Sequence, residues 1–293
     1  MRIVTQRAGF ISDDHANRLA RALRAKGVQR HSSSCMVYTL APSADQKALH
    51  ALCSDDDVDS AIFPESLSLS DFKLLVFDMD STLINIECID ELADLVGKKH
   101  EVAALTEQAM QSRQVDYDTS LRMRTRLLAG LSVDRFADLY AQRLHITPGA
   151  HALVKAAKTA GLKTAIVSGG FDYFTGRVRA ELGVEEDYSN HLEVVAGKLT
   201  GELVGTLINA DVKAQRVQAL CHDLGISTSE AIVVGDGAND LKMMALAGLA
   251  VGYRAKPVVR AAVSVNIERL GLNSLLTALD AQAVPGISGV EPR

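Results

Sequence analysis

Two aspartates lie two residues apart at the end of an apolar run, in residues 74–80, which read LLVFDMD. Such a run is typical of a buried strand, so Asp78 and Asp80 are expected at its carboxyl end, where open α/β sheets bind ligands. In an extended chain both side chains lie on the same side. Two carboxylates at such short range repel each other, so the site favours a bound cation. A set of oxygen ligands favours Mg²⁺. By itself the stretch also fits a strand ending in a polar turn.

Two later apolar runs also end in polar residues. Residues 164–167 precede Ser168-Gly169-Gly170, and residues 231–234 precede the loop 235–240, GDGAND. Glycines allow the backbone to approach a ligand closely, and the N–H groups at a helix start attract anions. Each loop alone also fits an ordinary strand-to-helix turn. Because parallel strands end at one edge of a sheet, we expect the three polar ends to meet there.

The order of elements predicts an α/β fold: a Rossmann-like three-layer parallel sheet with an inserted helical cap, preceded by a small α+β domain. A direct crossover after the first core strand would be short, so the long helical stretch that follows is interpreted as the cap. We divide the chain into residues 1–72 for the α+β domain, 73–85 and 144–280 for the catalytic core, 86–143 for the cap and 281–293 for a flexible tail.

The first domain shows no residues with evident chemistry. Its pattern predicts strands near 3–4, 35–40 and 61–63, with helices over 14–26 and 45–52, and a ferredoxin-like arrangement is one way to pack them. Residues 66–70 are interpreted as a linker. In the core, residues 192–195 and 199–203 predict a β-hairpin that decorates the fold.

Composition limits the classes of function. The 293 residues are 47% hydrophobic and 23% charged, with a net charge of −5, which argues against a nucleic-acid or anionic-membrane binder. We find neither an 18-residue uncharged apolar stretch nor a secretory leader at the start. The four cysteines show no metal-type spacing, and reduced thiols in a cytoplasmic protein are the simplest interpretation.

Four motifs together resemble, in order and spacing, the haloacid dehalogenase-like hydrolase superfamily. They are Asp78-x-Asp80-x-Thr82, Ser168, Lys213 and Gly235-Asp236-Gly237-x-Asn239-Asp240. Within that superfamily, the residues around the motifs, together with Glu87, Ser120, Leu121 and Arg124, are similar to the phosphatases that act on O-phosphoserine. The resemblance covers roughly residues 73–275.

The resemblance implies a role for each motif residue. Asp78 would be the nucleophile that forms an aspartyl-phosphate, and Asp80 the general acid and base. The carboxylates of Asp78 and Asp236 and the backbone carbonyl of Asp80 would hold Mg²⁺, with Asp240 and Thr82 in support. The residues implied to bind the phosphate are Ser168, Gly169, Lys213 and Asn239. Apart from the resemblance, Lys213 is a lone lysine of the kind that usually lies on a surface, and Asp240 also fits an acid at a helix start.

The cap is expected to select the substrate. On a helix over 117–128, Tyr117, Leu121, Arg124 and Leu128 share one face. A structural ion pair is the commoner reason for an arginine there, but the resemblance matches Arg124 with the position that binds the substrate carboxylate. It matches Glu87 with the position that binds the ammonium group, whereas periodicity alone places Glu87 toward solvent. Tyr117 stands where Phe is usual, so its hydroxyl either alters packing over the substrate or hydrogen-bonds it.

The resemblance implies Mg²⁺-dependent hydrolysis of O-phosphoserine to L-serine and phosphate, the last step of serine biosynthesis. One alternative is a phosphatase or phosphotransferase of the same superfamily that acts on another small phosphorylated metabolite. The other is a non-enzymatic phospho-acceptor module, which would be short and would lack a cap. We expect a small molecule as the partner, with no nucleic acid or membrane, and leave open whether the chain forms a homodimer.

Overall fold

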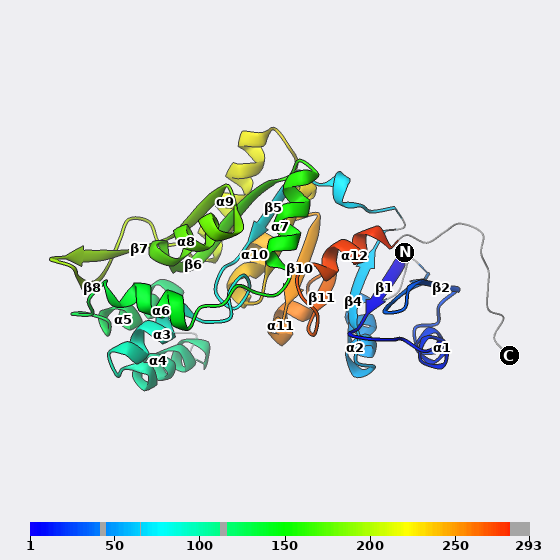
Figure 1. Ribbon diagram of the computed structural model, residues 1–293, viewed down its shortest axis with the longest axis horizontal. Coiled ribbons are helices and arrows are strands. Elements are labelled where there is room, and N and C mark those ends of the chain that lie inside the picture. The colour runs from blue at the N-terminus through cyan, green and yellow to red at the C-terminus, as the bar shows by residue number, and fades with distance from the viewer. Residues whose placement is uncertain (42–44, 65, 112–115, 282–293) are drawn as a thin grey trace.

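Eleven strands form one continuous sheet in the residues that the computed structural model describes, which are 1–41, 45–64, 66–111 and 116–281, without the side chains of 108–111 (Figure 1). The strand order is β2-β3-β1-β4-β11-β10-β9-β5-β6-β7-β8. No helix in these ranges is both long enough and apolar enough to cross a membrane.

The central strand of the core is β5 (Leu74–Phe77), which runs parallel to β9 (Ala231–Gly235) on one side and to β6 (Lys163–Phe171) on the other. Beyond β9, the sheet continues in parallel through β10 (Leu249–Tyr253) and β11 (Val265–Ile267). All four residues of β5 are fully buried, as expected for a parallel strand that is covered on both faces. The carboxyl ends of β5, β6 and β9 therefore share one edge.

Helices cover both faces of this parallel region, and alternate residues of β5 contact each layer. Leu75 and Phe77 belong to the same apolar cluster as α7 (Ala150–Thr159), α8 (Asp172–Leu182) and α12 (Ser274–Asp280). Leu74 and Val76 pack with α9 (Ala210–Leu224), α10 (Leu241–Met244) and α11 (Pro257–Arg260). The predicted three-layer α/β fold is confirmed, although the complete sheet is mixed rather than wholly parallel.

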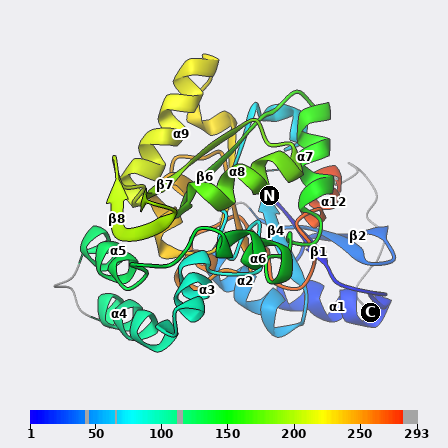
Figure 2. The ribbon, with the colours of Figure 1, turned by 60° about the vertical axis from the view of Figure 1, so that its left-hand side comes forward.

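Four of the helices between β5 and β6 form the cap, which lies beneath the left part of the sheet in Figure 1. They are α3 (Cys88–Leu95), α4 (Lys99–Gln111), α5 (Tyr117–Arg126) and α6 (Arg135–Gln142). All four fall within the range 86–143 that the sequence assigned to an inserted helical cap. Figure 2 shows α4 and α5 side by side, and the two helices are in contact.

The predicted hairpin consists of β7 (Glu186–Val195) and β8 (Lys198–Val204), and it contacts the cap. Its turn region forms three backbone hydrogen bonds with residues 130–133: Gly130 N–H to Leu199 O at 2.8 Å, Leu199 N–H to Leu131 O at 2.9 Å and Val133 N–H to Gly197 O at 3.0 Å. The interpretation of the hairpin as a decoration was wrong in this respect, because it ties the cap to the sheet.

The first 63 residues contain one more strand than the sequence pattern predicted. The elements are β1 (Arg2–Gln6), α1 (Asp13–Ala22), β2 (Gly27–Ser32), β3 (Cys35–Thr39), α2 (Gln46–Asp55) and β4 (Asp59–Phe63). The missed strand β2 reads GVQRHS and lies at the edge of the sheet, so it has no buried alternation to reveal it. Four antiparallel strands in the order β2-β3-β1-β4 give the ferredoxin-like arrangement.

The N-terminal unit continues directly into the core sheet. Strand β4 pairs antiparallel with β11, with Ala61 opposite Val265. Just beyond β11, the Asp59 carboxylate accepts backbone N–H groups of Glu268, Arg269 and Leu270 at 2.9–3.1 Å. The described part of the predicted linker leads into a short 3-10 helix, Leu69–Asp71. Of the predicted tail, Ala281 is buried, and residues 282–293 lie outside the described ranges.

Candidate active site

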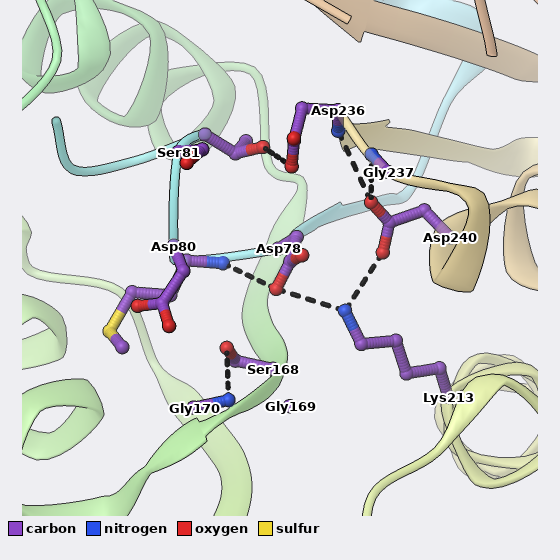
Figure 3. Close-up of polar contacts among 12 residues, drawn as sticks. Asp78, Asp80, Ser81, Ser168, Gly169, Gly170, Lys213, Asp236, Gly237 and Asp240 are labelled. Atoms are coloured by element: carbon purple, nitrogen blue, oxygen red, sulfur yellow. Dashed lines mark hydrogen bonds and ion pairs between the residues drawn. The ribbon is translucent and has the colours of Figure 1, made fainter. Parts of the chain in front are cut away.

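Asp78 lies directly after β5 and faces a charged network rather than a simple polar turn (Figure 3). Its backbone N–H donates to Val234 O at 2.9 Å, which extends the pairing with β9 by one residue. Its Oδ1 accepts from the Met79 N–H at 2.7 Å and lies 2.9 Å from Lys213 Nζ. Among the described residues, no hydrogen bond involves Oδ2, which leaves that oxygen free to react.

Lys213 is fully buried on the first turn of α9. Its Nζ donates to Asp240 Oδ1 at 2.8 Å as well as pairing with Asp78. Burial lowers the pKa of Lys213, but the carboxylates of Asp240 and Asp78 outweigh that effect, so the net pKa lies above its ordinary value. The lysine therefore carries a fixed positive charge at the edge of the sheet, where two anions surround it.

The loop after β9 carries Asp236, and hydrogen bonds to the Asp240 carboxylate fix its conformation. Asp240 Oδ2 accepts the N–H groups of Asp236 and Gly237, both at 3.1 Å. A Cβ at Gly235 would overlap the Asp240 carboxylate, which explains the glycine at the end of this strand. Asp236 Oδ1 accepts from Thr82 Oγ1 at 3.4 Å. Burial, followed by the charges of Asp78 and Asp240, raises the pKa of Asp236 to about 7.

The side chain of Asp80 points away from Asp236 (Figure 3). Its Oδ2 accepts the Cys88 N–H at 3.3 Å, and its buried Oδ1 has no hydrogen-bond partner among the described residues. Burial, followed by the charge of Glu87, raises the pKa of Asp80 well above its ordinary value. This carboxyl can therefore hold a proton at a pH where an exposed aspartate would be ionised.

A cavity of about 530 Å³ joins the core residues to the cap. From the predicted set, its lining includes Asp78, Asp80, Glu87, Tyr117, Arg124, Ser168, Gly169, Asp236 and Asn239. Lys213 and Asp240 do not line the cavity. Lys213 pairs with the Asp78 carboxylate, and Asp240 accepts the backbone N–H of Asp236. The structure thus brings all the predicted site residues together, although they come from segments more than 150 residues apart.

The two residues predicted to recognise the amino acid both lie at this cavity. Glu87 precedes α3, accepts from Ser81 Oγ at 2.7 Å and lines the cavity. It is exposed, as its periodicity indicated. Arg124 donates through Nε to Ser120 O at 3.3 Å and has no ion pair within 4 Å among the described residues. Within the part of the chain that the structure describes, the structural ion pair expected from the helix face is therefore not present.

Ser168 and Gly169 lie where β6 reaches the cavity. Ser168 is fully buried, and its Oγ accepts the Gly170 N–H at 3.0 Å. The Gly169 carbonyl accepts from Asn190 Nδ2 at 2.8 Å, and Asn190 Oδ1 accepts the Ile208 N–H at 2.8 Å. Asn190 was missed by sequence reasoning because it lies within β7 and carries no charge, yet it links the Gly169 peptide to the chain entering α9.

Sequence reasoning also missed two charged residues that line the cavity. Lys256 follows β10, and its Nζ lies 3.8 Å from Asp236 Oδ2. Its position after another core strand was a usable signal. Asp90 lies one turn beyond Glu87 on the cap helix α3. Burial raises the pKa of Asp90, while the charge of Arg124 opposes that shift.

The carboxylates fit a hard divalent cation. Asp78, Asp236 and Asp240 each place an oxygen within 4.8 Å of the others, and an all-oxygen set suits Mg²⁺. Both oxygens of Asp240 are already used by Lys213 and two N–H groups, so Asp240 is better placed to support the site than to bind the ion. The carboxylate of Asp80 turns away, which leaves its backbone carbonyl as the predicted ligand.

Comparisons with known proteins agree on one family. Residues 75–245 match the family of haloacid dehalogenase-like hydrolases. The chain is 53% identical over 214 residues to a phosphoserine phosphatase of Polaromonas sp., which covers 72% of this chain and 91% of that protein. A crystal structure of a HAD-family hydrolase from Salmonella enterica serovar Typhi superposes with a TM-score of 0.85 at 30% identity, covering 97% of this chain and 100% of that one. A phospho-aspartyl intermediate analogue of phosphoserine phosphatase superposes with a TM-score of 0.65 at 35% identity, covering 70% and 98%.

Proposed function

The chain belongs to the haloacid dehalogenase-like hydrolase family, and from that premise we propose that it hydrolyses O-phosphoserine to L-serine and inorganic phosphate. The observation that carries the proposal is the set of residues that line the cavity between the core and the cap. Its lining includes a carboxylate fixed by a buried lysine, and also Arg124 and Glu87, a cation and an anion suited to the two charged groups of an amino acid. The name of the Polaromonas relative supports the same substrate.

The proposed reaction has two steps at Asp78. Its free oxygen attacks phosphorus to form an aspartyl-phosphate, and the serine oxygen leaves with a proton from Asp80. The raised pKa of Asp80 supports this role, because the acid must be protonated at that step. Asp80 then accepts a proton from the water that hydrolyses the acyl phosphate. The two steps regenerate both aspartates and release serine and phosphate.

Positioning and charge neutralisation supply much of the catalysis in phosphoryl transfer. We propose that Ser168, the Gly169 N–H, Lys213 and Asn239 bind the phosphoryl oxygens. Asp78, Asp236 and the Asp80 carbonyl would hold Mg²⁺, with Thr82 and Asp240 in support through their bonds to Asp236. A bound divalent cation would neutralise negative charge on the phosphoryl group.

We assign substrate recognition to the cap. The planar guanidinium of Arg124 can donate two parallel hydrogen bonds to the serine carboxylate, and Glu87 can accept from its ammonium group. Hydrolysis of O-phosphoserine would end serine biosynthesis, a cytoplasmic role. The division into domains at residues 72, 85, 143 and 280 remains a prediction that accompanies this assignment.

A phosphate-release assay tests the proposal against its alternatives. The protein is given O-phosphoserine and a panel of other small phosphoesters, with Mg²⁺ and with EDTA. We expect O-phosphoserine to be the preferred substrate and EDTA to stop its hydrolysis. Preference for another phosphoester, or transfer of phosphate to an acceptor other than water, would favour a different enzyme of the family. The absence of any turnover would favour a phospho-acceptor module.

A further inference from the structure

Tyr117 brings a hydroxyl group into the cavity that none of the proposed roles uses. It is the first residue of the cap helix α5, and its side chain lines the cavity together with Asp78, Ser168 and Gly169. Among the described residues, the hydroxyl has no hydrogen-bond partner. A hydroxyl that faces a ligand cavity without a protein partner is available to bond a ligand there.

The position of the hydroxyl indicates which part of a ligand it meets. It lies against the backbone of Gly169: a Cβ added there would overlap the Tyr117 oxygen, and the ring carbon that bears it would be 3.6 Å away. Gly169 is the residue whose N–H we assign to the phosphoryl group. The Tyr117 oxygen is also near enough to Lys213, Arg124 and Asp78 to be affected by their charges.

The fold fixes this position from both sides. Asp118, the next residue of α5, accepts two hydrogen bonds from Asn209 Nδ2, at 3.0 and 3.2 Å. Asn209 precedes α9, the helix that carries Lys213. On the other side, the Gly169 carbonyl is fixed by Asn190. The hydroxyl therefore lies between two anchored segments, the start of α5 and the Gly169 peptide.

We propose that the Tyr117 hydroxyl donates a hydrogen bond to a phosphoryl oxygen of the substrate, as a further catalytic residue beside Ser168, the Gly169 N–H and Lys213. This inference rests on the proposed function for the identity of the phosphoester. The phenol is neutral and able to donate at physiological pH, since burial raises the pKa of Tyr117 to about 12. The three equatorial phosphoryl oxygens carry charge in the transition state, so a fixed donor beside one of them helps to stabilise it.

The test is Tyr117→Phe, which removes one oxygen and keeps the ring. We expect kcat/KM to fall about tenfold, the size expected for a hydrogen bond to a charged group. The loss should be equal for O-phosphoserine and for phosphoethanolamine, which lacks the carboxylate. Tyr140→Phe is the matched control, since its hydroxyl bonds Glu181 on α8, outside the cavity, and it should leave kcat/KM unchanged.

A binding measurement separates this inference from the proposed function. Calorimetry with inorganic phosphate and Mg²⁺ should show about tenfold weaker binding to Tyr117→Phe than to the unmodified chain. That result would uphold the hydroxyl contact even if O-phosphoserine were not hydrolysed. Unchanged phosphate affinity and unchanged kcat/KM would show that the hydroxyl only packs on Gly169. A loss confined to O-phosphoserine would place the hydroxyl on the serine portion, and either result would overturn the proposal.

Discussion

The site depends on individual charges that are held by named partners. Asp78 is oriented by the Met79 N–H and Lys213, while Asp80, only two residues later, is bonded to the Cys88 N–H of the cap. Two carboxyls that are almost adjacent in the chain thus have different surroundings. In the proposed reaction, this difference suits Asp78 to act as the nucleophile and Asp80 as the proton donor.

Asp78→Asn should reduce phosphate release at least a thousandfold, because an amide does not replace the carboxylate nucleophile. The variant should still bind inorganic phosphate, since the other phosphate ligands remain. Steady-state assays and calorimetry check the two expectations separately. Retention of more than a tenth of the activity would rule out Asp78 as the nucleophile.

Arg124→Ala tests recognition of the substrate carboxylate. We expect kcat/KM for O-phosphoserine to fall about a hundredfold, which corresponds to the loss of a charge-assisted contact. Turnover of phosphoethanolamine should change much less. The neighbouring Arg126→Ala serves as a control, because Arg126 pairs with Glu202 at the surface. Equal losses on both substrates would remove Arg124 from recognition of the carboxylate.

At the scale of elements, the cap helix α5 is held by contacts that no motif includes. The amide of Asn209 has two functions: its Oδ1 accepts the first N–H groups of α9, and its Nδ2 donates to Asp118 of the cap. Asp caps a helix as well as Asn does. A change to Asp therefore affects the contact with the cap and spares the start of the helix.

Asn209→Asp should raise KM for O-phosphoserine several-fold with little change in the midpoint of unfolding in urea, because two carboxylates would then repel each other across the contact. Adding Asp118→Asn restores a donor and acceptor with their positions exchanged, and we expect that double variant to recover most of the affinity. Kinetics on the single and double variants provide the comparison. If the double variant is no better than Asn209→Asp alone, the contact does not position the cap.

The elements also show where sequence reasoning succeeds and where it stops. The buried core strands and the aspartates at their ends could be predicted, because long apolar runs and glycine-rich loops are local signals. Asn190 and the hairpin contact with residues 130–133 could not, since both depend on pairing between distant segments. Strand β2 was missed because none of its residues is fully buried and most are polar, so only its pairing with β3 makes it a strand.

At the scale of the whole molecule, the N-terminal unit and the core are joined by buried polar contacts. His50 of α2 is 6% exposed; its Nδ1 lies 2.7 Å from Ser60 Oγ and its Nε2 lies 3.1 Å from Val263 O in the core. Burial lowers the pKa of His50 to about 4. The helical periodicity of α2 could indicate that His50 is buried. Its contact with Val263 could not be predicted, because it depends on the tertiary fold.

The junction should therefore weaken in acid. The unfolded chain protonates His50 near its ordinary pKa of about 6.5, whereas the folded chain stays neutral down to about 4, so folding stability falls as pH drops through that window. Between pH 7.5 and pH 5 this group should remove about 2 kcal/mol from the free energy of unfolding. Urea unfolding of His50→Gln should show a pH dependence smaller by that amount. Exposed His222→Gln is the control, and an identical slope for the unmodified chain and His50→Gln would contradict the assignment.

The most direct test of the whole account is to trap the intermediate. The protein is mixed with O-phosphoserine and Mg²⁺, quenched during turnover and treated with borohydride, which reduces an acyl phosphate to an alcohol, and the modified residue is then located by mass spectrometry. The account predicts that residue 78 is recovered as homoserine only when substrate is present. Turnover that continues with residue 78 unmodified, or with the modification on another carboxylate, would contradict it.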